Sequence, residues 1–348
     1  MKKIISLLSF LAVSVMTFSQ NPMAISLNNG WQFSEASKNE WKEAVVPGSV
    51  QSDLIRLGLL PDPYYGTNEN LVQWPEEKDW DYKMSFNLTA EQLKSDGALL
   101  IFEGLDTHAD VFLNGARILQ TQNMFVGHQI PVKNSLRAGE NSLFIRFYSP
   151  VKRMEPARLT AGYEYPAGND HSDKKVSIFN RKAPYQFGWD WGIRLVQMGI
   201  WKPVTLRFYN KAIIDNFYVK QISITKDKAV TDNQIEIYST SETPAKISTG
   251  AGFNSLPVLS VDKEIVLKKG KNIVSIPLTI DNPNLWMPAG WGKQNLYDFS
   301  VKVYIGDKLV SEKTEKIGLR KVRLVQQPDE HGKSFYFEVN DIPLFAKG

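Results

Sequence analysis

The strict alternation of apolar and polar residues in several segments restricts this chain to a narrow range of folds. Apolar side chains occupy every second position from Tyr297 to Ile305, and residues 141–148 repeat the pattern. Such alternation is typical of strands that bury one face. Asn114-Gly115 and Gly306-Asp307 separate strand-like runs and suit tight hairpin turns. We therefore predict an all-β chain. Strand and helix signals do not alternate along the sequence, so we do not expect a parallel sheet.

The strand signals fall into two units. The first unit, residues 20–210, ends with a strand near 203–209. It also contains two short helical signals: Ser49 is expected to cap one helical turn, and Thr89 with Gln92 resembles a capping box. The second, residues 211–318, has turns about every ten residues over roughly 100 residues, as in an immunoglobulin-like sandwich.

The last segment, residues 319–348, does not close a domain. Two short apolar strands flank the turn Asn340-Asp341, and we expect them to form a hairpin. This hairpin leaves Phe335, Phe337 and Phe345 without a partner, so we expect it to belong to something larger.

The N-terminus has the pattern of a secretory signal peptide over residues 1–19. Lys2 and Lys3 precede an uncharged, largely apolar run that is too short to span a bilayer. We therefore expect an exported protein, periplasmic or extracellular, that does not associate with the membrane after signal removal. The chain has no cysteine, so no disulfide framework is possible. Loss of the two lysines lowers the formal net charge from +4 to +2, and no basic stripe suggests nucleic acid as a partner.

Most polar clusters in the sequence are predicted to be structural. The four histidines stand far apart, without metal-ligand spacing, and we expect neither a metal nor a cofactor. Asp170, His171 and Asp173 lie together in GNDHSDKK; a metal or acid–base role is possible, but a solvated loop is the favoured interpretation. The Pro-rich segment 61–65 (PDPYY) is expected to pack at one end of a sandwich.

The stretch YQFGWDWG, residues 185–192, is the strongest candidate for a binding site. Trp189 and Trp191 flank Asp190, with Gly188 and Gly192 on either side. In one interpretation the indoles fill the sandwich core and Asp190 is a turn carboxylate. In an extended strand, however, the two indoles share one face, so if that face pointed outward Asp190 would point towards the core, and an unpaired buried carboxylate is costly. In the other, the glycines permit a loop in which a ring offers a platform for a pyranose and the carboxylate accepts hydrogen bonds from neighbouring hydroxyls.

The segment 181–204, RKAPYQFGWDWGIRLVQMGIWKPV, resembles the N-terminal signature of glycoside hydrolase family 2 β-mannosidases. The resemblance extends over essentially the whole mature chain. It includes VPGSVQSDLIRLGLLPDPYYGTNE, DWDY, FEGLDTHADVFLNG, PAGNDHSDKK, LWMPAGWGKQNLY, GLRKVRL and SFYFEVNDIPLFAKG.

This resemblance implies a jelly-roll-like sugar-binding sandwich, then an immunoglobulin-like sandwich, then a (β/α)₈ barrel that would begin where the chain ends. It implies a retaining exo-β-mannosidase acting on β-mannosides or mannan-derived oligosaccharides. The family's two catalytic glutamates lie in the barrel, so no residue of this chain is assigned a catalytic role, and the fragment alone is expected to be inactive. Asp190 and Trp189, with Trp191, would wall the pocket for the terminal sugar.

Two alternatives remain open from the sequence. The chain could be a stand-alone carbohydrate-binding protein of two sandwiches. It could also belong to an exo-β-glucosaminidase or an endo-β-mannosidase, which are built on the same plan, because the barrel residues that distinguish the sugars are not in this sequence.

Overall fold

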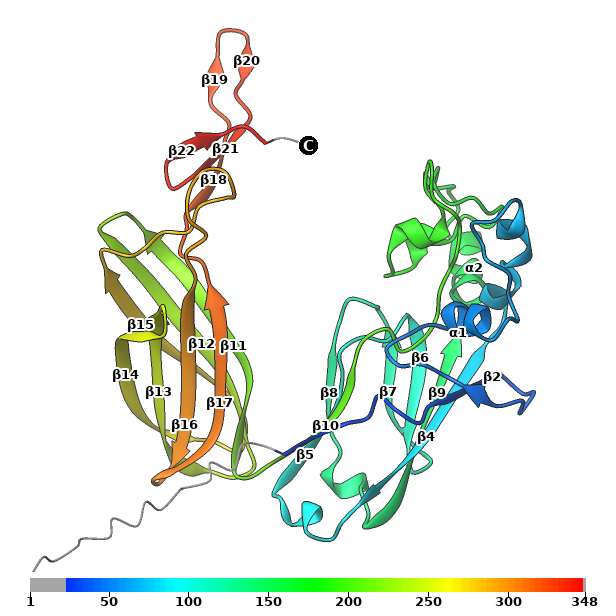
Figure 1. The fold of residues 1–348 in the computed structure, drawn as a ribbon, viewed down its shortest axis with the longest axis horizontal. Coiled ribbons are helices and arrows are strands. Elements are labelled where there is room, and N and C mark those ends of the chain that lie inside the picture. Colours follow the sequence, from blue (N-terminus) through cyan, green and yellow to red (C-terminus); the bar gives the residue numbers. More distant parts are fainter. Residues whose placement is uncertain (1–22, 347–348) are drawn as a thin grey trace, which may run out of the picture. The chain divides into compact units, whose positions relative to one another are not determined.

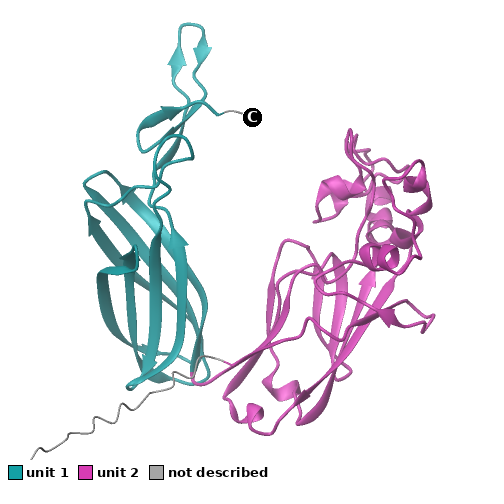
Figure 2. Cartoon of the chain, viewed as in Figure 1, with its two compact units in different colours: residues 1–21, 212–348 teal, residues 22–211 magenta. Residues whose placement is uncertain are grey.

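The computed structural model describes residues 23–346, so the predicted signal peptide lies outside the described part. The chain divides into two compact units, one from Pro22 to Lys211 and one that begins at Ala212 (Figure 2). This division falls one residue after the boundary suggested by the sequence. Antiparallel strands form the framework of each unit (Figure 1), which confirms the predicted all-β class.

The first unit contains two antiparallel sheets. The six-stranded sheet is, in order, β3 (Lys42–Glu43), β2 (Gln32–Glu35), β4 (Trp80–Leu88), β9 (Gly139–Tyr148), β6 (His108–Leu113) and β7 (Ala116–Gln122). The four-stranded sheet is β1 (Ala24–Ser26), β10 (Val204–Tyr209), β5 (Gly97–Phe102) and β8 (His128–Pro131). Tyr82 and Phe147 of the larger sheet and Phe102 and Leu206 of the smaller one belong to a single buried cluster, so the core lies between the sheets.

The period-two pattern correctly predicts strand β9, whose buried and partly exposed residues alternate along residues 141–148. The hairpin between β6 and β7 turns at Asn114 (φ +51°) and Gly115 (φ +84°). Both residues adopt the left-handed conformation that Asn-Gly favours, so the predicted turn is confirmed.

Helices are few and short in the described part of the first unit. Helix α1 (Val50–Arg56) begins after Ser49, whose hydroxyl accepts a bond from the Ser52 amide, as the sequence predicts. Helix α2 (Pro150–Thr160) was not predicted, because it buries only its first two residues and therefore shows no apolar stripe. Short 3₁₀ turns are η1 (Asn68–Leu71), η2 (Trp74–Glu77), η3 (Gln92–Lys94), η4 (Lys133–Ser135), η5 (Ser177–Phe179) and η6 (Pro184–Phe187). None of the helices between residues 23 and 346 is long and apolar enough to cross a membrane.

The second unit begins with a seven-stranded sandwich of the immunoglobulin-like kind. One sheet is β11 (Ala212–Ile224), β12 (Lys228–Ser239) and β15 (Gly270–Asp281); the other is β14 (Leu256–Leu267), β13 (Thr243–Phe253), β16 (Tyr297–Ile305) and β17 (Lys308–Ile317). Ile235 and Ile237 of the first sheet pack with Ile247 and Phe299 of the second in one buried cluster. Strand β13 was not predicted, since its proline and two glycines obscure the alternation.

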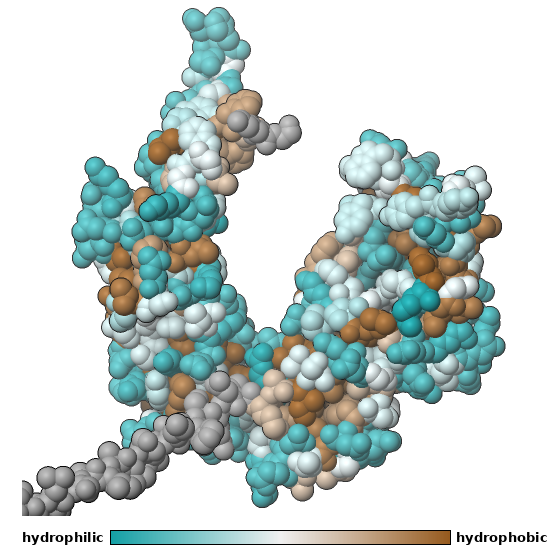
Figure 3. All heavy atoms as spheres, in the orientation of Figure 1, coloured by the Kyte–Doolittle hydropathy of each residue, from teal (hydrophilic) through white to brown (hydrophobic). Residues whose placement is uncertain are grey.

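A smaller set of strands follows the sandwich. Strands β18 (Val322–Val325), β21 (Tyr336–Val339) and β22 (Ile342–Leu344) form one sheet, and β19 (Pro328–Asp329) pairs with β20 (Gly332–Lys333). Phe335 and Phe345 are 70% and 78% exposed, and Phe337 is also exposed, as the sequence predicts. Figure 3 shows tan and brown atoms gathered on this terminal segment.

Candidate functional site

Residues 189–192 form a tight turn at the surface of the first unit. The Trp189 amide donates to the Gly192 carbonyl and the Gly192 amide donates to the Trp189 carbonyl, each with an N···O distance of 3.3 Å. Trp191 is 89% exposed, Trp189 is 40% exposed, and Asp190 is exposed as well. The interpretation in which the indoles fill the core is therefore wrong. The turn presents a carboxylate and two indole rings to solvent.

Gly188 sets the direction in which the chain enters this turn. Its φ of +114° with ψ of 165° is a conformation that is essentially restricted to glycine. A Cβ at this position would lie 2.7 Å from His171 Nδ1 and 2.8 Å from the Asn169 carbonyl oxygen. The His171 amide also donates to the Phe187 carbonyl at 3.0 Å. The segment around His171 thus packs directly against the start of the turn.

Replacing Gly188 by alanine should destabilise the first unit by about 1–3 kcal/mol, because the new methyl group meets the Asn169 carbonyl oxygen and the His171 ring and the φ is unfavourable. Thermal unfolding measures this loss. Gly168→Ala is the matched control, since a Cβ at Gly168 meets nothing within 4 Å. Equal melting temperatures for the two variants would contradict the close packing of Gly188 against residues 169–171.

A buried ion pair anchors the chain before the turn. The Lys182 ammonium lies 2.6 and 2.7 Å from the two carboxylate oxygens of Asp106, and both side chains are almost completely buried. Lys182 also donates to the Gln186 side-chain oxygen at 2.5 Å and to the Gln197 carbonyl at 2.8 Å. Burial lowers the pKa of the Lys182 ammonium, and the nearby Asp106 opposes this shift. The Lys182 ammonium therefore links Gln186, before the turn, to Gln197, after it.

Arg194 anchors the chain after the turn. Its amide donates to Glu69 Oε1 at 2.7 Å and its carbonyl accepts from Gln73 Nε2 at 2.8 Å. Its buried guanidinium donates to the Gln73 and Glu76 side chains and lies 3.6 Å from a carboxylate oxygen of Asp170. Burial raises the pKa of the Glu76 carboxyl, although Arg194 opposes the shift. Both the backbone and the side chain of this residue are fixed.

The segment GNDHSDKK is a surface loop, as the sequence predicts, but its Asp170 side chain is buried. Asp170 is 1% exposed, and its carboxylate accepts from the Ser172 hydroxyl at 2.8 Å and from the Ser172 and Ser177 amides at 3.2 and 3.0 Å. These local bonds and Arg194 satisfy a buried charge, which the residue types alone do not reveal. Within residues 23–346, no group of three or more His, Asp or Glu side chains is arranged to hold a metal ion.

The segment PDPYY also differs from its predicted packing role. Tyr64 and Tyr65 are each 77% exposed. Tyr64 lines a cavity of about 230 Å³, which we call the Tyr64 cavity, together with Tyr185, Ile193 and Trp201. Pro63 is buried and Pro61 is half-buried, so the prolines of this segment pack against the unit while its two rings face solvent.

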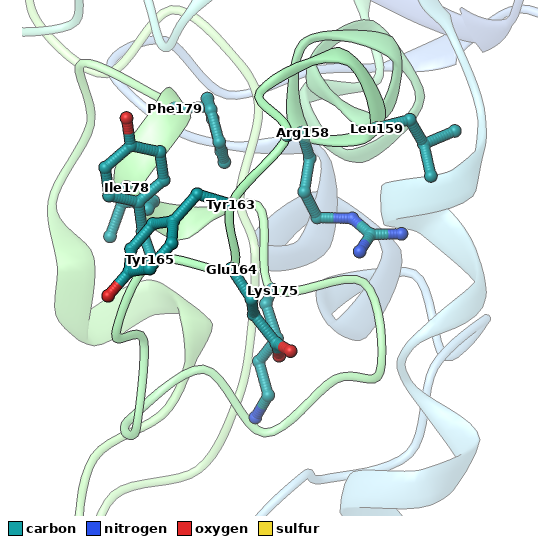
Figure 4. A pocket seen from close by; sticks show the side chains of 9 residues that line it. Arg158, Leu159, Tyr163, Glu164, Tyr165, Lys175, Ile178 and Phe179 are labelled. Atoms are coloured by element: carbon teal, nitrogen blue, oxygen red, sulfur yellow. The ribbon is translucent and has the colours of Figure 1, made fainter.

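A second concavity lies beside helix α2 (Figure 4). This concavity, which we call the Tyr163 pocket, has a volume of about 190 Å³, and its labelled side chains include Arg158, Tyr163, Glu164, Tyr165 and Lys175. The Tyr163 and Tyr165 rings meet edge to face, with centroids 5.1 Å apart. The sequence analysis did not identify this pocket, although the Tyr-Glu-Tyr run at residues 163–165 is a feature that could have indicated it.

Two comparisons link the chain to known protein families. Residues 31–202 match the glycosyl hydrolase 2 galactose-binding domain-like family, and residues 213–320 match glycosyl hydrolases family 2. β-Mannosidase B of Thermothelomyces thermophilus is 35% identical over 342 residues, which are 94% of this chain and 38% of that protein. β-Mannosidase B of Aspergillus clavatus is 34% identical over 328 residues, 92% of this chain and 38% of that protein.

Solved structures agree with the sequence relationships. The crystal structure of β-D-mannosidase from Dictyoglomus thermophilum matches with a TM-score of 0.88 and 39% identity, covering 94% of this chain and 40% of that one. The exo-chitosanase CsxA of Amycolatopsis orientalis, at 20% identity and a TM-score of 0.69 over 93% of this chain and 36% of its own, shows the shared fold alone. The chain thus spans about two fifths of the length of the curated relatives it matches. It belongs to glycosyl hydrolase family 2 and is similar to the N-terminal portion of that family's β-mannosidases.

Proposed function

We propose that this chain is part of an exported exo-β-mannosidase, which hydrolyses terminal, non-reducing β-D-mannose residues with retention of configuration. In this proposal the turn at residues 189–192 forms one wall of the sugar pocket. The two catalytic carboxyl groups, about 5–5.5 Å apart in retaining enzymes, lie in a (β/α)₈ barrel outside this sequence. The similarity to β-mannosidases over more than nine tenths of the chain supports the substrate class.

The observation that carries the proposal is an exposed carboxylate held beside exposed indole rings on a turn whose two ends are anchored by buried charges. An ionised carboxylate accepts two charge-assisted hydrogen bonds, so Asp190 suits a pair of neighbouring sugar hydroxyls. Trp189 offers an apolar ring face for the C–H side of the same sugar, and Trp191 shapes the rim. Rigid anchoring fixes the sugar before reaction and lowers the entropic cost of its orientation.

A wall at this point also explains why only the bond to the terminal sugar would be cleaved. A pocket that is closed beyond the terminal sugar accepts only a chain end, so cleavage removes one residue at a time. In this proposal Asp190 accepts hydrogen bonds from hydroxyls at the end of the sugar opposite the bond that breaks. Its role is therefore binding and orientation, while protonation of the leaving oxygen and attack on the anomeric carbon belong to the barrel.

Asp190→Ala tests the assignment in the protein translated from the whole reading frame that contains this chain. We expect kcat/KM on an aryl β-D-mannoside to fall about 100-fold or more, since each hydrogen bond to a charged group contributes about 1.5–3 kcal/mol. Asp173→Ala is the matched control, because Asp173 is another solvent-accessible aspartate in the same unit.

Two results would contradict the proposal. An unchanged kcat/KM for Asp190→Ala would remove this residue from the sugar pocket. Faster hydrolysis of an aryl β-D-glucosaminide than of the mannoside by the unmodified protein would replace the substrate.

A further inference from the structure

A polar pocket lies on the face of the six-stranded sheet that is turned away from the buried core. The register of this sheet places Gln122 of β7 and Tyr148 of β9 directly opposite His108 of β6, so the three side chains project from one face. Arg153 of helix α2 lies over the Tyr148 ring, with its guanidinium carbon 5.1 Å from the ring centroid. All four residues line a cavity of about 160 Å³, which we call the Arg153 pocket. No residue of the turn at residues 189–192 lines it.

The imidazole of His108 is held in one orientation and in one tautomer. His108 is 5% exposed, and its Nε2 atom lies 2.9 Å from the side-chain oxygen of Asn180. The Asn180 amide nitrogen donates to the Val176 carbonyl at 2.9 Å, which leaves the amide oxygen facing His108, so Nε2 must provide the proton of this bond. In the described part of the chain, the other ring nitrogen, Nδ1, has no hydrogen-bond partner. A buried and fixed imidazole therefore has one nitrogen available to a ligand.

Arg153 gives the pocket a positive charge that is not neutralised. Within residues 23–346, its guanidinium forms no ion pair with a carboxylate. The two acidic side chains near His108 have cations of their own. Asp110, in the next row of the same sheet face, lies 3.6 Å from Arg117 and accepts two further side-chain hydrogen bonds. Asp106, two residues before His108 in the chain, is paired with Lys182. The pocket therefore favours a ligand with negative charge.

The charges around His108 connect anion binding to proton uptake. Burial lowers the pKa of the His108 imidazole, and the hydrogen bond to Asn180 opposes this shift. The charges of Arg153 and Lys182 lower this pKa further, whereas the charge of Asp106 raises it. The imidazole is therefore neutral at neutral pH when no anion is bound. A negative charge beside the ring favours the protonated form, in which Nδ1 becomes a second charged donor to the same ligand.

The size and the remaining lining of the pocket restrict the ligand to a small group. Its volume of about 160 Å³ is well below the roughly 300–1,000 Å³ of pockets that enclose drug-sized molecules. The fork of donors on Arg153 matches the spacing of two oxygens of one oxyanion. In the described residues, the Gln122 side-chain amide has no hydrogen-bond partner and is a further donor on the lining. An oxyanion of a few atoms meets these conditions.

We infer that the Arg153 pocket is a binding site for the oxyanion of a sulfate or phosphate group, which the Arg153 guanidinium and the His108 imidazole hold together. The anion is either a free inorganic ion or a charged substituent of a larger molecule, since both present the same oxygens. Binding takes up a proton at His108, so the affinity increases as the pH falls. This site is separate from the turn at residues 189–192, and the inference does not depend on the proposed function.

Titration of the 348-residue chain with sodium sulfate, compared with sodium chloride at equal ionic strength, tests the inference. Sulfate stays a dianion throughout the range in which histidine titrates, so any change of affinity with pH comes from the protein. NMR of the imidazole groups measures the His108 pKa with and without sulfate. We expect sulfate to raise this pKa and chloride to leave it unchanged. Sulfate affinity should increase as the pH falls, by up to about tenfold per pH unit, the limit for uptake of one proton.

Three variants assign the effect to the pocket. Arg153→Met should weaken sulfate binding about tenfold or more, because it removes the charged fork. Lys152→Met is the matched control: it removes the same charge from the neighbouring exposed position, which does not line the pocket, and should bind like the unmodified chain. His108→Gln keeps a donor towards Asn180 but cannot titrate, so it should abolish the pH dependence of binding.

Three results would each overturn the oxyanion site: sulfate binding no stronger than chloride binding, a His108 pKa that saturating sulfate does not move, or equal affinities of Arg153→Met and Lys152→Met. If His108→Gln does not fold, the pKa measurement and the two exposed-residue variants still decide. Methyl sulfate separates the two sources of the anion. Binding as tight as that of sulfate assigns the site to a substituent of a larger molecule, and binding at least about tenfold weaker assigns it to a free inorganic ion.

Discussion

Replacing Lys182 by methionine should destabilise the first unit by about 3–5 kcal/mol, because Asp106 is then left buried without its cation. The carboxylate would keep only its bonds to Gln186 and Thr107, and neither neighbour carries a charge. Urea denaturation followed by tryptophan fluorescence measures the loss. Seven of the nine tryptophans lie between Pro22 and Lys211, so this signal reports mainly on the first unit.

A second substitution distinguishes the unpaired charge from a simple packing defect. Lys182→Met/Asp106→Leu removes both charges, and replacing a whole buried pair by apolar groups is often nearly neutral. We expect the double variant to recover at least half of the lost stability. If it is as unstable as Lys182→Met, or if Lys182→Met unfolds within about 1 kcal/mol of the unmodified chain, the ion pair does not anchor the turn.

Arg194→Met should have a comparable effect, about 3–5 kcal/mol, with a distinctive dependence on pH. Arg194 lies against the carboxylates of Glu76 and Asp170, and burial already raises the pKa of Glu76 above its usual 4.5. Removing the cation raises this pKa further. A carboxyl whose folded pKa is raised contributes stability below its unfolded pKa and loses it as pH rises through the folded pKa. The destabilisation should therefore grow as the pH rises from the usual carboxyl pKa of 4.5 towards neutral pH.

The assignment of this pH dependence to Glu76 can be checked directly. Arg194→Met/Glu76→Gln carries an amide that does not titrate, so most of the added pH dependence should disappear. A loss of stability in Arg194→Met that stays constant over this range would show that Glu76 remains ionised without its partner, and the proposed role of Arg194 in keeping this carboxyl charged would be wrong.

The overall fold could be predicted because its strands bury one face each. Strands β9 and β16 show this plainly, and the Asn114-Gly115 turn has the backbone conformation that its residues favour. Helix α2 could not be predicted by the same reasoning, because it lies on the surface and carries no apolar stripe. Periodicity reports burial, and an element with little burial gives little signal.

The candidate turn could be identified for a different reason. Trp189, Asp190 and Trp191 are neighbours in the sequence, and the flanking glycines indicate a loop. Its anchors could not be identified, because Lys182 and Asp106 are 76 residues apart and Arg194 and Glu76 are 118 apart. Lysine and arginine are also rarely buried, so composition argues against such anchors until the partners are seen together.

The separation between the turn and its anchors has a consequence for how this protein can change. Trp191 and Asp190 contribute no packing to the core, whereas the residues that hold the turn contribute no atom to its tip. Under the proposed function, selection for a new carbohydrate preference can therefore act on the codons of Asp190 and Trp191 while leaving the scaffold's thermodynamic reserve intact. This short tip is accordingly the natural place to graft altered recognition, in the laboratory as in evolution.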